Sequence, residues 1–256
     1  RGVLREHRIE GVVHFAAYKA AGESVIVPGK YFDNNVYGTQ CLLEAMREVG
    51  PGDAIAIPPG AQVIDLGDAT LSPGFIDAHT HLTSDFSGNY NERRLKELDL
   101  TITELAYTYI AHARATIEAG FTTVRDVGSR ITNTHDFPDV GLRNAINRGL
   151  VVGPRMLVAT HGIGASGGHF DPFSGFRDMI FGREPDWTDG IADSPDEIRK
   201  AVRHEVKNGA DVIKAAVSGG VLSLADEVDV PQLTPGEMAD LVDESHRLRK
   251  KVAVHC

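Results

Sequence analysis

Two histidines separated by a single residue, His79 and His81, carry the clearest chemical signal in the chain. They follow the apolar run that starts at Phe75, and a short apolar run of this kind is typical of a buried β-strand. Side chains alternate between the two faces of a strand, so both imidazoles should point to the same side. Imidazole nitrogens are common zinc ligands. The pair therefore predicts two ligands of a divalent metal, with ordinary core or surface histidines as the alternative.

Lys214 needs an explanation because it stands inside the apolar run from Val212 to Val217. Burial disfavours the charged amine and lowers its pKa. A neutral lysine amine can add carbon dioxide, and the resulting carbamate offers two oxygens that can bridge two cations. The alternative is a lysine at the end of a sheet whose amine reaches solvent. His255, which ends the last apolar run of the chain, is a further candidate metal ligand.

Three other side chains are candidates for substrate contact. Arg125 ends the second predicted strand and could bind a substrate carboxylate, although pairing with the adjacent Asp126 or with other local carboxylates is an equal alternative. His161 and His169 flank a glycine-rich segment and could touch substrate, but loop histidines are as often simply solvated. No chemical role is assigned to the histidines of expected helices, which are His112, His204 and His246.

The elements that must position these residues alternate between strand and helix. Ser194 and Thr234 are each followed by Pro and, two residues later, by Glu, which is a strong helix-start pattern. Strands joined in sequence by helices form a parallel sheet. The predicted strands span 75–79, 122–126, 155–160, 211–217 and 251–256, and the predicted helices span 102–119, 141–148, 194–208 and 234–250.

The fold class that follows is α/β. A complete (β/α)8 barrel typically takes about 250 residues, and residues 75–256 supply only five strand-helix units, which predicts a partial barrel. Short turn-bounded runs at 61–66 and 69–72 predict small β-strands, the remnant of a small β-domain at residues 51–74. In residues 1–50, a short apolar run followed by apolar residues at helical spacing predicts a Rossmann-type fragment with a strand at 11–17 and a helix at 30–48.

A glycine pattern at Gly162, Gly164 and Gly167 satisfies the dinucleotide-binding spacing G-x-G-x-x-G. A functional pattern of this kind must open a helix. The residues that follow, from His169 to Phe173, show no helical period. We therefore expect a mobile active-site loop here and no dinucleotide turn.

Composition excludes several classes of protein. The 256 residues carry 36 acidic and 26 basic side chains, a formal charge of −10, with no basic stripe, so no nucleic-acid partner is expected. A content of 42% apolar residues with a mean hydropathy of −0.16 is typical of a soluble globular chain. No apolar run is long enough to span a membrane, and no membrane partner is expected. Two distant cysteines, Cys41 and Cys256, indicate a reducing compartment, so we expect a cytoplasmic protein.

Much of the chain from residue 51 onward resembles the amidohydrolase superfamily, in particular its imidazolonepropionase-like branch with Xaa-Pro dipeptidases. The segments that carry this resemblance are 63–68, 73–82, 118–128, 209–214 and 252–255. The resemblance implies that His79 and His81 bind one zinc, that Lys214 is carboxylated and bridges two metals, and that His255 is a further ligand. Zn2+ is the implied cofactor, as one or two ions, although manganese or iron would also suit these ligands.

The same resemblance implies an activity. A metal-activated hydroxide would hydrolyse a peptide or another amide bond in a dipeptide or other small-molecule substrate. In the family, a histidine of strand six and a proton-shuttling aspartate of strand eight complete the site, and both would follow Cys256. We therefore expect a truncated barrel with impaired or no activity, and its open edges could support self-association.

Residues 1–50 resemble a different family, the UDP-glucose 4-epimerases, through the segments 14–24 and 31–39. The resemblance implies that Phe15, Lys19 and Asn34 line a dinucleotide. The family's glycine-rich turn and its catalytic Tyr-x-x-x-Lys pair are missing, so NAD binding is not expected.

The chain thus looks like a chimera of fragments at 1–50, 51–74 and 75–256. Two further functional hypotheses stay open beside the amidohydrolase. One is a non-catalytic fusion or scaffold polypeptide, and the other is an epimerase-like NAD-dependent isomerase.

Overall fold

The computed structural model describes residues 72–84, 99–129, 136–176, 182–221, 223 and 226–256, together with six single residues between 41 and 96. The chain divides into two compact units, Arg1–Thr70 and Leu71–Cys256, and the description that follows concerns the second. The predicted strand at 11–17, the helix at 30–48 and the small strands at 61–66 and 69–72 lie outside the described residues, except for Cys41 and Glu44, which are helical, and Ser72. The three predicted fragments and their boundaries stay a prediction.

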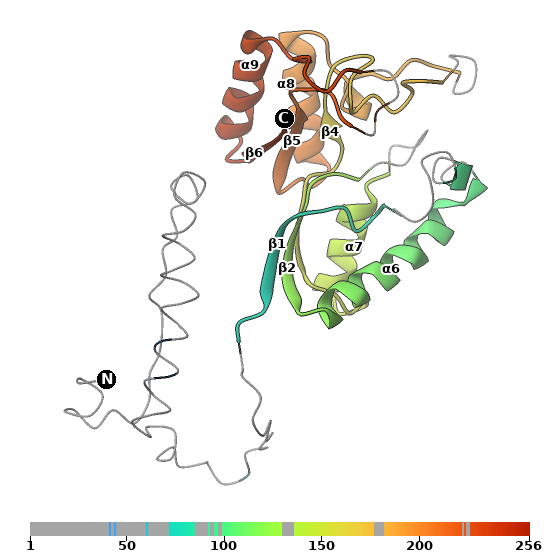
Figure 1. The fold of residues 1–256 in the computed structure, drawn as a ribbon, viewed down its shortest axis with the longest axis vertical. Helices are drawn as coiled ribbons and strands as arrows, with labels where there is room; N and C mark the ends of the chain where they lie inside the picture. The colour runs from blue at the N-terminus through green and yellow to red at the C-terminus, as the bar shows by residue number, and fades with distance from the viewer. Residues whose placement is uncertain are drawn as a thin grey trace, which may run out of the picture. The chain divides into compact units, whose positions relative to one another are not determined.

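Parallel strands and helices alternate along the second unit (Figure 1), which confirms the predicted α/β class. Between residues 75 and 256, each predicted strand is present at least in part, and each predicted helix lies between the strands as expected. In chain order the elements are β1 (Phe75–Thr80), α6 (Ile102–Glu118), β2 (Phe121–Asp126), α7 (Pro138–Asn147), β3 (Arg155–Val158), β4 (Gly162–Ile163), η4 (Trp187–Asp189), α8 (Pro195–Lys207), β5 (Val212–Ala216), α9 (Pro235–Arg247) and β6 (Lys251–His255).

The third predicted strand is broken into two, which corrects the expected single strand at 155–160. The described strands pair in the orders β1-β2-β3 and β4-β5-β6, and every pairing is parallel. The break falls at Thr160, whose φ of 60° lies in the left-handed region that a β-branched residue rarely adopts. The buried carboxylate of Asp139 on α7 accepts a 2.8 Å hydrogen bond from the Thr160 N–H and holds this conformation.

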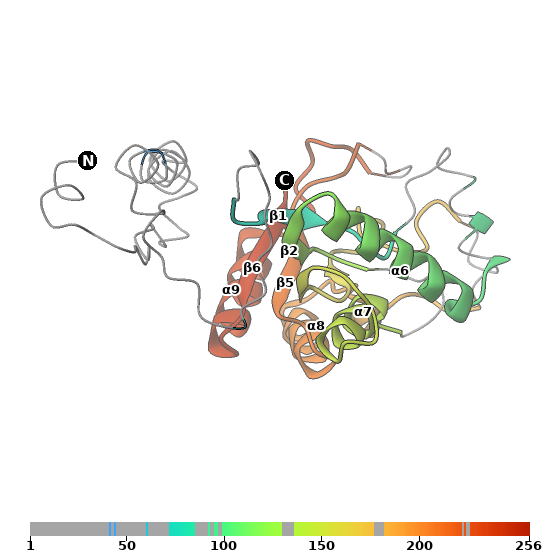
Figure 2. The ribbon, with the colours of Figure 1, turned by 90° about the horizontal axis from the view of Figure 1, so that it is seen from below.

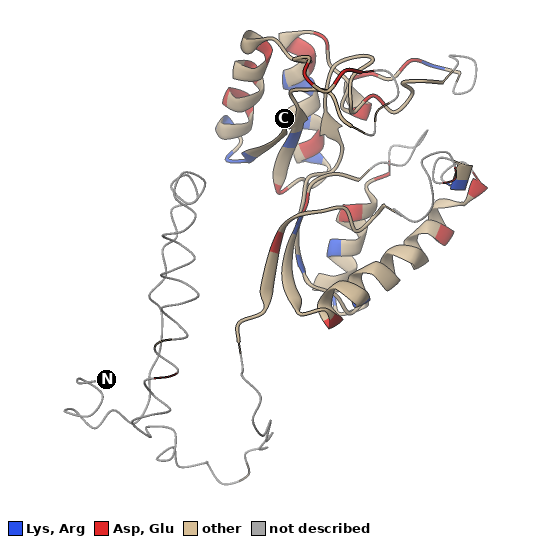
Figure 3. Cartoon of the chain, in the orientation of Figure 1, with Lys and Arg blue, Asp and Glu red and all other residues tan. Residues whose placement is uncertain are grey.

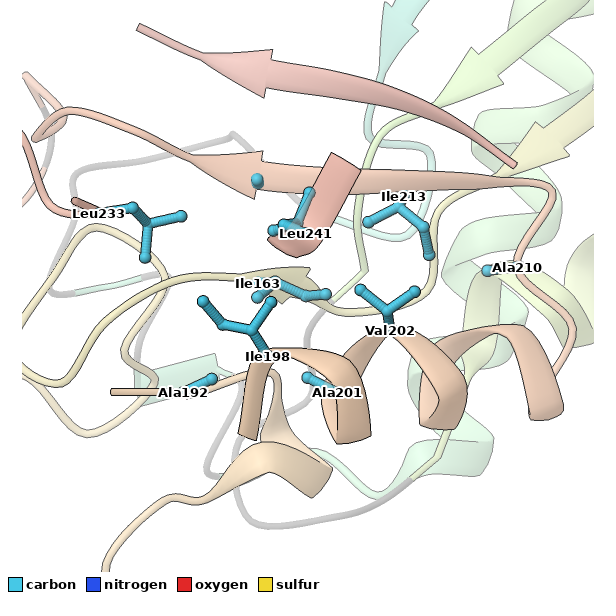
Figure 4. Close-up of a cluster of buried hydrophobic side chains, with 10 residues drawn as sticks. Ile163, Ala192, Ile198, Ala201, Val202, Ala210, Ile213, Leu233 and Leu241 are labelled. Atoms are coloured by element: carbon cyan, nitrogen blue, oxygen red, sulfur yellow. The ribbon is translucent and has the colours of Figure 1, made fainter. Parts of the chain in front are cut away.

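Helices cover one face of these strands and create two apolar cores. In the first core, side chains of α6 and α7 pack against alternate residues of β2 and β3. In the second core, side chains of α8 and α9 pack against β4 and β5 (Figure 4). Figure 2 shows the same helices beside the strands from a second direction. The buried strand residues are Val124, Met156 and Val158 in the first core and Ile163, Ile213 and Ala215 in the second.

The described strands do not close into a barrel. Their hydrogen-bonded order places β1 at one end and β6 at another. In place of a closed barrel, the described residues form parallel strands with helices on one face. Self-association through open strand edges stays a prediction.

Helix starts agree with the sequence patterns. The Ser194 and Thr234 side chains accept hydrogen bonds from the backbone N–H groups of Glu197 and Glu237, as predicted. Helix α7 begins at Pro138, three residues before the predicted start at Gly141, and proline at the first helical position explains this earlier start.

Charged side chains of both signs are interspersed along α8 and α9 (Figure 3). The two helices are joined by an ion pair between Arg199 and Asp240 and by another between Arg203 and Glu244, where N and O are 2.7 Å apart. None of the helices in the described part of the chain is long and apolar enough to cross a membrane.

Candidate metal and substrate site

Strand alternation places the predicted metal ligands on the sheet face that the helices do not cover, which we call the inner face. Val124 and Ile213 point into the helix-covered cores, so their neighbours Arg125 and Lys214 point to the inner face. His255 pairs in register with Ala216, two residues from Lys214, and so shares this face. Thr80 pairs with the core-facing Asp126, so His79 and His81 on either side of it also lie on the inner face.

The two histidines of the first strand lie next to each other, with ring centroids 5.3 Å apart. Nδ1 of His81 is 2.8 Å from the carbonyl oxygen of Gly128, and since a carbonyl only accepts, Nδ1 carries the proton. In that neutral tautomer the lone pair is on Nε2, an arrangement common among metal-binding histidines. Asp77 accepts a 2.9 Å hydrogen bond from the His79 backbone N–H and so braces the strand locally.

Lys214 is almost fully buried, with 2% of its surface exposed. Burial lowers the pKa of the Lys214 amine, and the positive charge of Arg125 lowers it further. Both causes favour the neutral amine that a carbamate requires. The sequence-based reason for singling out this lysine, a charge inside an apolar strand, therefore has a physical counterpart, while carboxylation itself stays a prediction.

Burial and nearby charges lower the pKa values of both histidines of the first strand. Burial is the largest cause that lowers the pKa of His79, followed by the charges of Lys214 and Arg125, with a smaller contribution from His255. Burial also lowers the pKa of His81, with further lowering by His79, Lys214 and His255. Both rings are thereby kept in the neutral form that can bind a cation.

The donor set suits a divalent cation, although its full geometry is not assembled. Neutral imidazoles and a desolvated lysine amine are groups that can serve a zinc site. Among the described residues, however, no three His, Cys, Asp or Glu side chains are close enough to hold one ion together. The assignment of His79, His81, Lys214 and His255 as metal ligands therefore stays a prediction.

Arg125 lies beside the predicted ligands, and it is not paired with Asp126 as the alternative interpretation held. Its Nε donates a 2.7 Å hydrogen bond to the carbonyl oxygen of Ala78, on the neighbouring strand. Asp126 points into the opposite face, where it accepts a hydrogen bond from the Leu82 N–H at 2.5 Å. The guanidinium has further N–H groups that could meet an anionic group of a substrate.

His169 also reaches this site. Its ring stacks on the ring of His255, with centroids 4.3 Å apart and an angle of 26° between the planes. The next residue, Phe170, lies against β4, where a Cβ added to Gly162 would come within 2.5 Å of the phenyl ring. The glycine spacing of this segment therefore serves an aromatic contact, and no helix follows it, as predicted.

His161 is placed elsewhere, on the helix-covered side of the broken third strand. Its ring is stacked on Phe137 at 4.7 Å, and its Nδ1 lies 3.9 Å from the buried carboxylate of Glu205 on α8. The contacts described for this residue do not join it to His79, His81, Lys214 or His255. Its predicted role in substrate binding stays a prediction.

Two contributors to the site were missed in the sequence. The carbonyl oxygen of Gly128 orients His81, and no side-chain pattern can reveal a backbone acceptor. Phe170 was passed over as part of a loop, although the glycines before it were noticed. The predicted dinucleotide residues Phe15, Lys19 and Asn34 lie outside the described residues.

Comparison with protein families separates the chain into two parts. Residues 70–256 match the amidohydrolase family, and residues 1–57 match GDP-mannose 4,6 dehydratase. In the N-terminal part, 50 residues are 54% identical to UDP-glucose 4-epimerase from Neisseria gonorrhoeae, covering 20% of this chain and 15% of that protein. Both resemblances predicted from the sequence are confirmed.

Individual relatives of the larger part are hydrolases. The chain is 30% identical over 197 residues to ochratoxinase from Aspergillus niger, covering 72% of this chain and 38% of the relative. It is similar to a crystal structure of a Xaa-Pro dipeptidase with bound methionine in the active site, with a TM-score of 0.62 and 34% identity over 72% of this chain and 43% of that one. A prolidase complexed with N-methylphosphonate-L-proline gives a TM-score of 0.63 at 29% identity, over 80% and 48% of the two chains.

The chain thus spans less than half the length of each of these hydrolases. The family match covers most of the chain, and it includes every element from β1 to β6. Through residues 70–256, the chain belongs to the amidohydrolase family.

Proposed function

We propose that the inner face is part of a metal-dependent site that hydrolyses an amide bond in a small substrate, with a dipeptide or an N-acyl amino acid as the substrate class. The observation that carries this proposal is the placement of His79, His81, Lys214 and His255 on one face by strand register, with the two histidine rings of the first strand next to each other. Sequence relatives that include ochratoxinase and a Xaa-Pro dipeptidase support the reaction class.

The residues of the chain would take separate parts in such a site. His81 offers Nε2 because Gly128 holds its Nδ1 proton, and His79 is kept neutral by burial and nearby positive charge. Lys214, carboxylated on its amine, would supply oxygen ligands. A divalent cation bound by these groups would supply Lewis acidity, which acidifies water and polarises a carbonyl.

Arg125 would orient the substrate. Its guanidinium lies near His79 and Lys214, and arginine binds carboxylates in a planar, two-pronged geometry. A substrate with a free carboxylate, such as a dipeptide or an N-acyl amino acid, would therefore be held with its amide bond towards the cation.

The test is hydrolysis of Xaa-Pro dipeptides and N-acyl amino acids by the purified chain with added zinc, compared with the His79→Ala/His81→Ala variant. We expect slow, zinc-dependent turnover, as for an impaired site, and its loss in the double variant. The Arg125→Gln variant should chiefly raise KM for substrates that carry a free carboxylate. Turnover equal in the wild type and the double variant would contradict the proposal, and zinc binding without turnover would favour the non-catalytic scaffold instead.

A further inference from the structure

His169 makes more contacts than a solvated loop histidine would need. Its backbone N–H donates to Oε1 of Gln232 at 3.0 Å, and its Nδ1 lies 2.7 Å from the hydroxyl oxygen of Ser223. Both partners belong to the segment between β5 and α9, more than fifty residues away in sequence. The ring is thus fixed on one edge by a hydroxyl, while the backbone is fixed by an amide side chain.

The backbone around the ring is shaped to admit it. A Cβ added to Gly220 would clash with the imidazole ring of His169. One added to Gly168 would lie 2.7 Å from Oε1 of Gln232 and 2.9 Å from the carbonyl oxygen of Ala165, so a larger residue at either position would force a neighbouring group to shift. The loop that carries His169 and the loop that follows β5 therefore fit together as one unit.

The ring of His255 packs against one face of the His169 ring. The two rings stack at 4.3 Å between centroids, and Nε2 of His255 is 3.3 Å from the carbonyl oxygen of Gly219. A carbonyl oxygen only accepts, so this contact requires the proton on Nε2 and leaves Nδ1 as the nitrogen with a lone pair. His255 is the last residue of β6.

We propose that His169 is a positioning residue that fixes the ring of His255 by stacking, so that Nδ1 of His255 is held ready for a cation. The inference rests on the proposed metal site, because positioning has a function only if His255 is a ligand. It assigns His169 a role through another residue, in place of direct contact with substrate. Groups that orient a metal ligand typically change metal affinity about 10–100-fold when they are removed.

The experiment compares His169→Ala, His169→Phe and the control His246→Ala, which removes an exposed histidine of α9. Two properties are measured on the full chain. The first is the protonation pattern of the His255 ring nitrogens without metal, read from 15N NMR shifts assigned with His255→Ala. The second is the Kd for zinc, measured by competition with a chromogenic chelator.

We expect the wild type and His246→Ala to show one Nε2–H tautomer of His255 and the same Kd. His169→Ala should give a mixture of tautomers and a Kd raised about 10–100-fold, while His169→Phe keeps the aromatic stack and most of the affinity. If circular dichroism shows that His169→Ala is unfolded, Ser223→Ala takes its place, with a smaller change expected in the same direction.

The positioning role is overturned if folded His169→Ala keeps both the tautomer and the Kd of His246→Ala. If the wild type binds no zinc, the proposed function fails, and the NMR measurement on the metal-free chain still decides whether His169 orients His255. The two failures are therefore distinguishable.

Discussion

Gly162 illustrates, at the scale of single residues, how one sequence pattern can serve two different structures. Its spacing with Gly164 fits a dinucleotide turn, yet in the structure both glycines lie beside Phe170. An added Cβ would come within 2.5 Å of the phenyl ring at Gly162 and within 3.3 Å of the Phe170 side chain at Gly164. The absence of a side chain thus admits an aromatic ring next to Lys214, with which Gly162 pairs in register.

Replacing Gly162 with alanine should therefore displace the Phe170 ring. We expect the free energy of unfolding to fall by about 1–3 kcal/mol, the usual cost of overpacking. The double variant Gly162→Ala/Phe170→Ala should show less than the sum of the two single losses, because the clash is then absent. Urea denaturation measures all three.

A matched control for this prediction is Gly141→Ala in α7. No atom lies within 4 Å of a Cβ added there, and alanine is the better helix former, so this variant should gain up to about 1 kcal/mol. If Gly162→Ala and Gly141→Ala change the free energy of unfolding by the same amount, the packing explanation is contradicted.

At the scale of elements, the helices end in one repeated way. The residue after each C-cap is left-handed, and it is Gly120 after α6, Gly149 after α7 and Gly209 after α8. After α9 the same position is Arg249, with a φ of 59°. Its N–H donates to the carbonyl oxygen of His246 at 2.9 Å, so the hydrogen bonding of the helix end is kept despite the larger residue.

The exception predicts a stabilising substitution. A left-handed non-glycine residue costs roughly 1–2 kcal/mol of stability. Glycine removes this strain, but part of the stabilisation is offset because glycine gives the unfolded chain more conformational entropy. Arg249→Gly should therefore raise the free energy of unfolding by about 0.5–1 kcal/mol. Gly209→Ala should lower it by about 1 kcal/mol or more, since an added Cβ would also meet Val140 at 3.2 Å. Equal signs for the two variants in thermal and chemical denaturation would refute this account of the helix ends.

At the scale of the whole described unit, buried carboxyl groups from two helices bind the backbone at the break between β3 and β4, between the two apolar cores. Asp139 on α7 holds the Thr160 N–H, and Glu205 on α8 accepts a 3.2 Å hydrogen bond from the next residue, His161. Both carboxyl groups are fully buried. Burial raises the pKa of Asp139 and raises that of Glu205 to about 8.

The raised pKa of Glu205 predicts that stability falls as pH rises. Between its ordinary pKa of 4.5 and about 8, the folded chain binds a proton that the unfolded chain has released. The free energy of unfolding therefore decreases through this window, and above it the buried charge exerts its full cost. Glu205→Gln should remove the share of this fall that Glu205 carries and leave the share of Asp139, so the variant should match the wild type near pH 5 and exceed it by a few kcal/mol, in order of magnitude, at pH 9. Parallel pH profiles for the two proteins would show that Glu205 does not carry the effect.

The fold was predictable where local patterns agreed with tertiary packing. Alternation of apolar runs with capped helices indicated the parallel strands, and the caps at Ser194 and Thr234 lie where expected. The break at Thr160 was not predictable, because a left-handed threonine exists only through the distant carboxylate of Asp139. The residues next to Thr160 in the sequence do not reveal such a contact.

The candidate site was predictable in its residue types and less so in its surroundings. Alternation within strands was sufficient to place His79, His81 and Lys214 on one face. It could not indicate that the ring of His161 stacks on Phe137 and lies 3.9 Å from the Glu205 carboxylate, because both partners are distant in sequence. The partners of His169 come from the segment after β5, and no spacing rule links the two loops.

The central claim is that the inner face binds a divalent cation through His79 and His81 with Lys214 and His255. The most direct measurement is the zinc content of the purified chain after loading and dialysis, determined by plasma mass spectrometry for the wild type, for His79→Ala/His81→Ala and for the control His246→Ala. The account predicts about one equivalent or more in the wild type and the control, and its loss in the double variant. Less than one equivalent in the wild type, or undiminished zinc in the double variant, would contradict it.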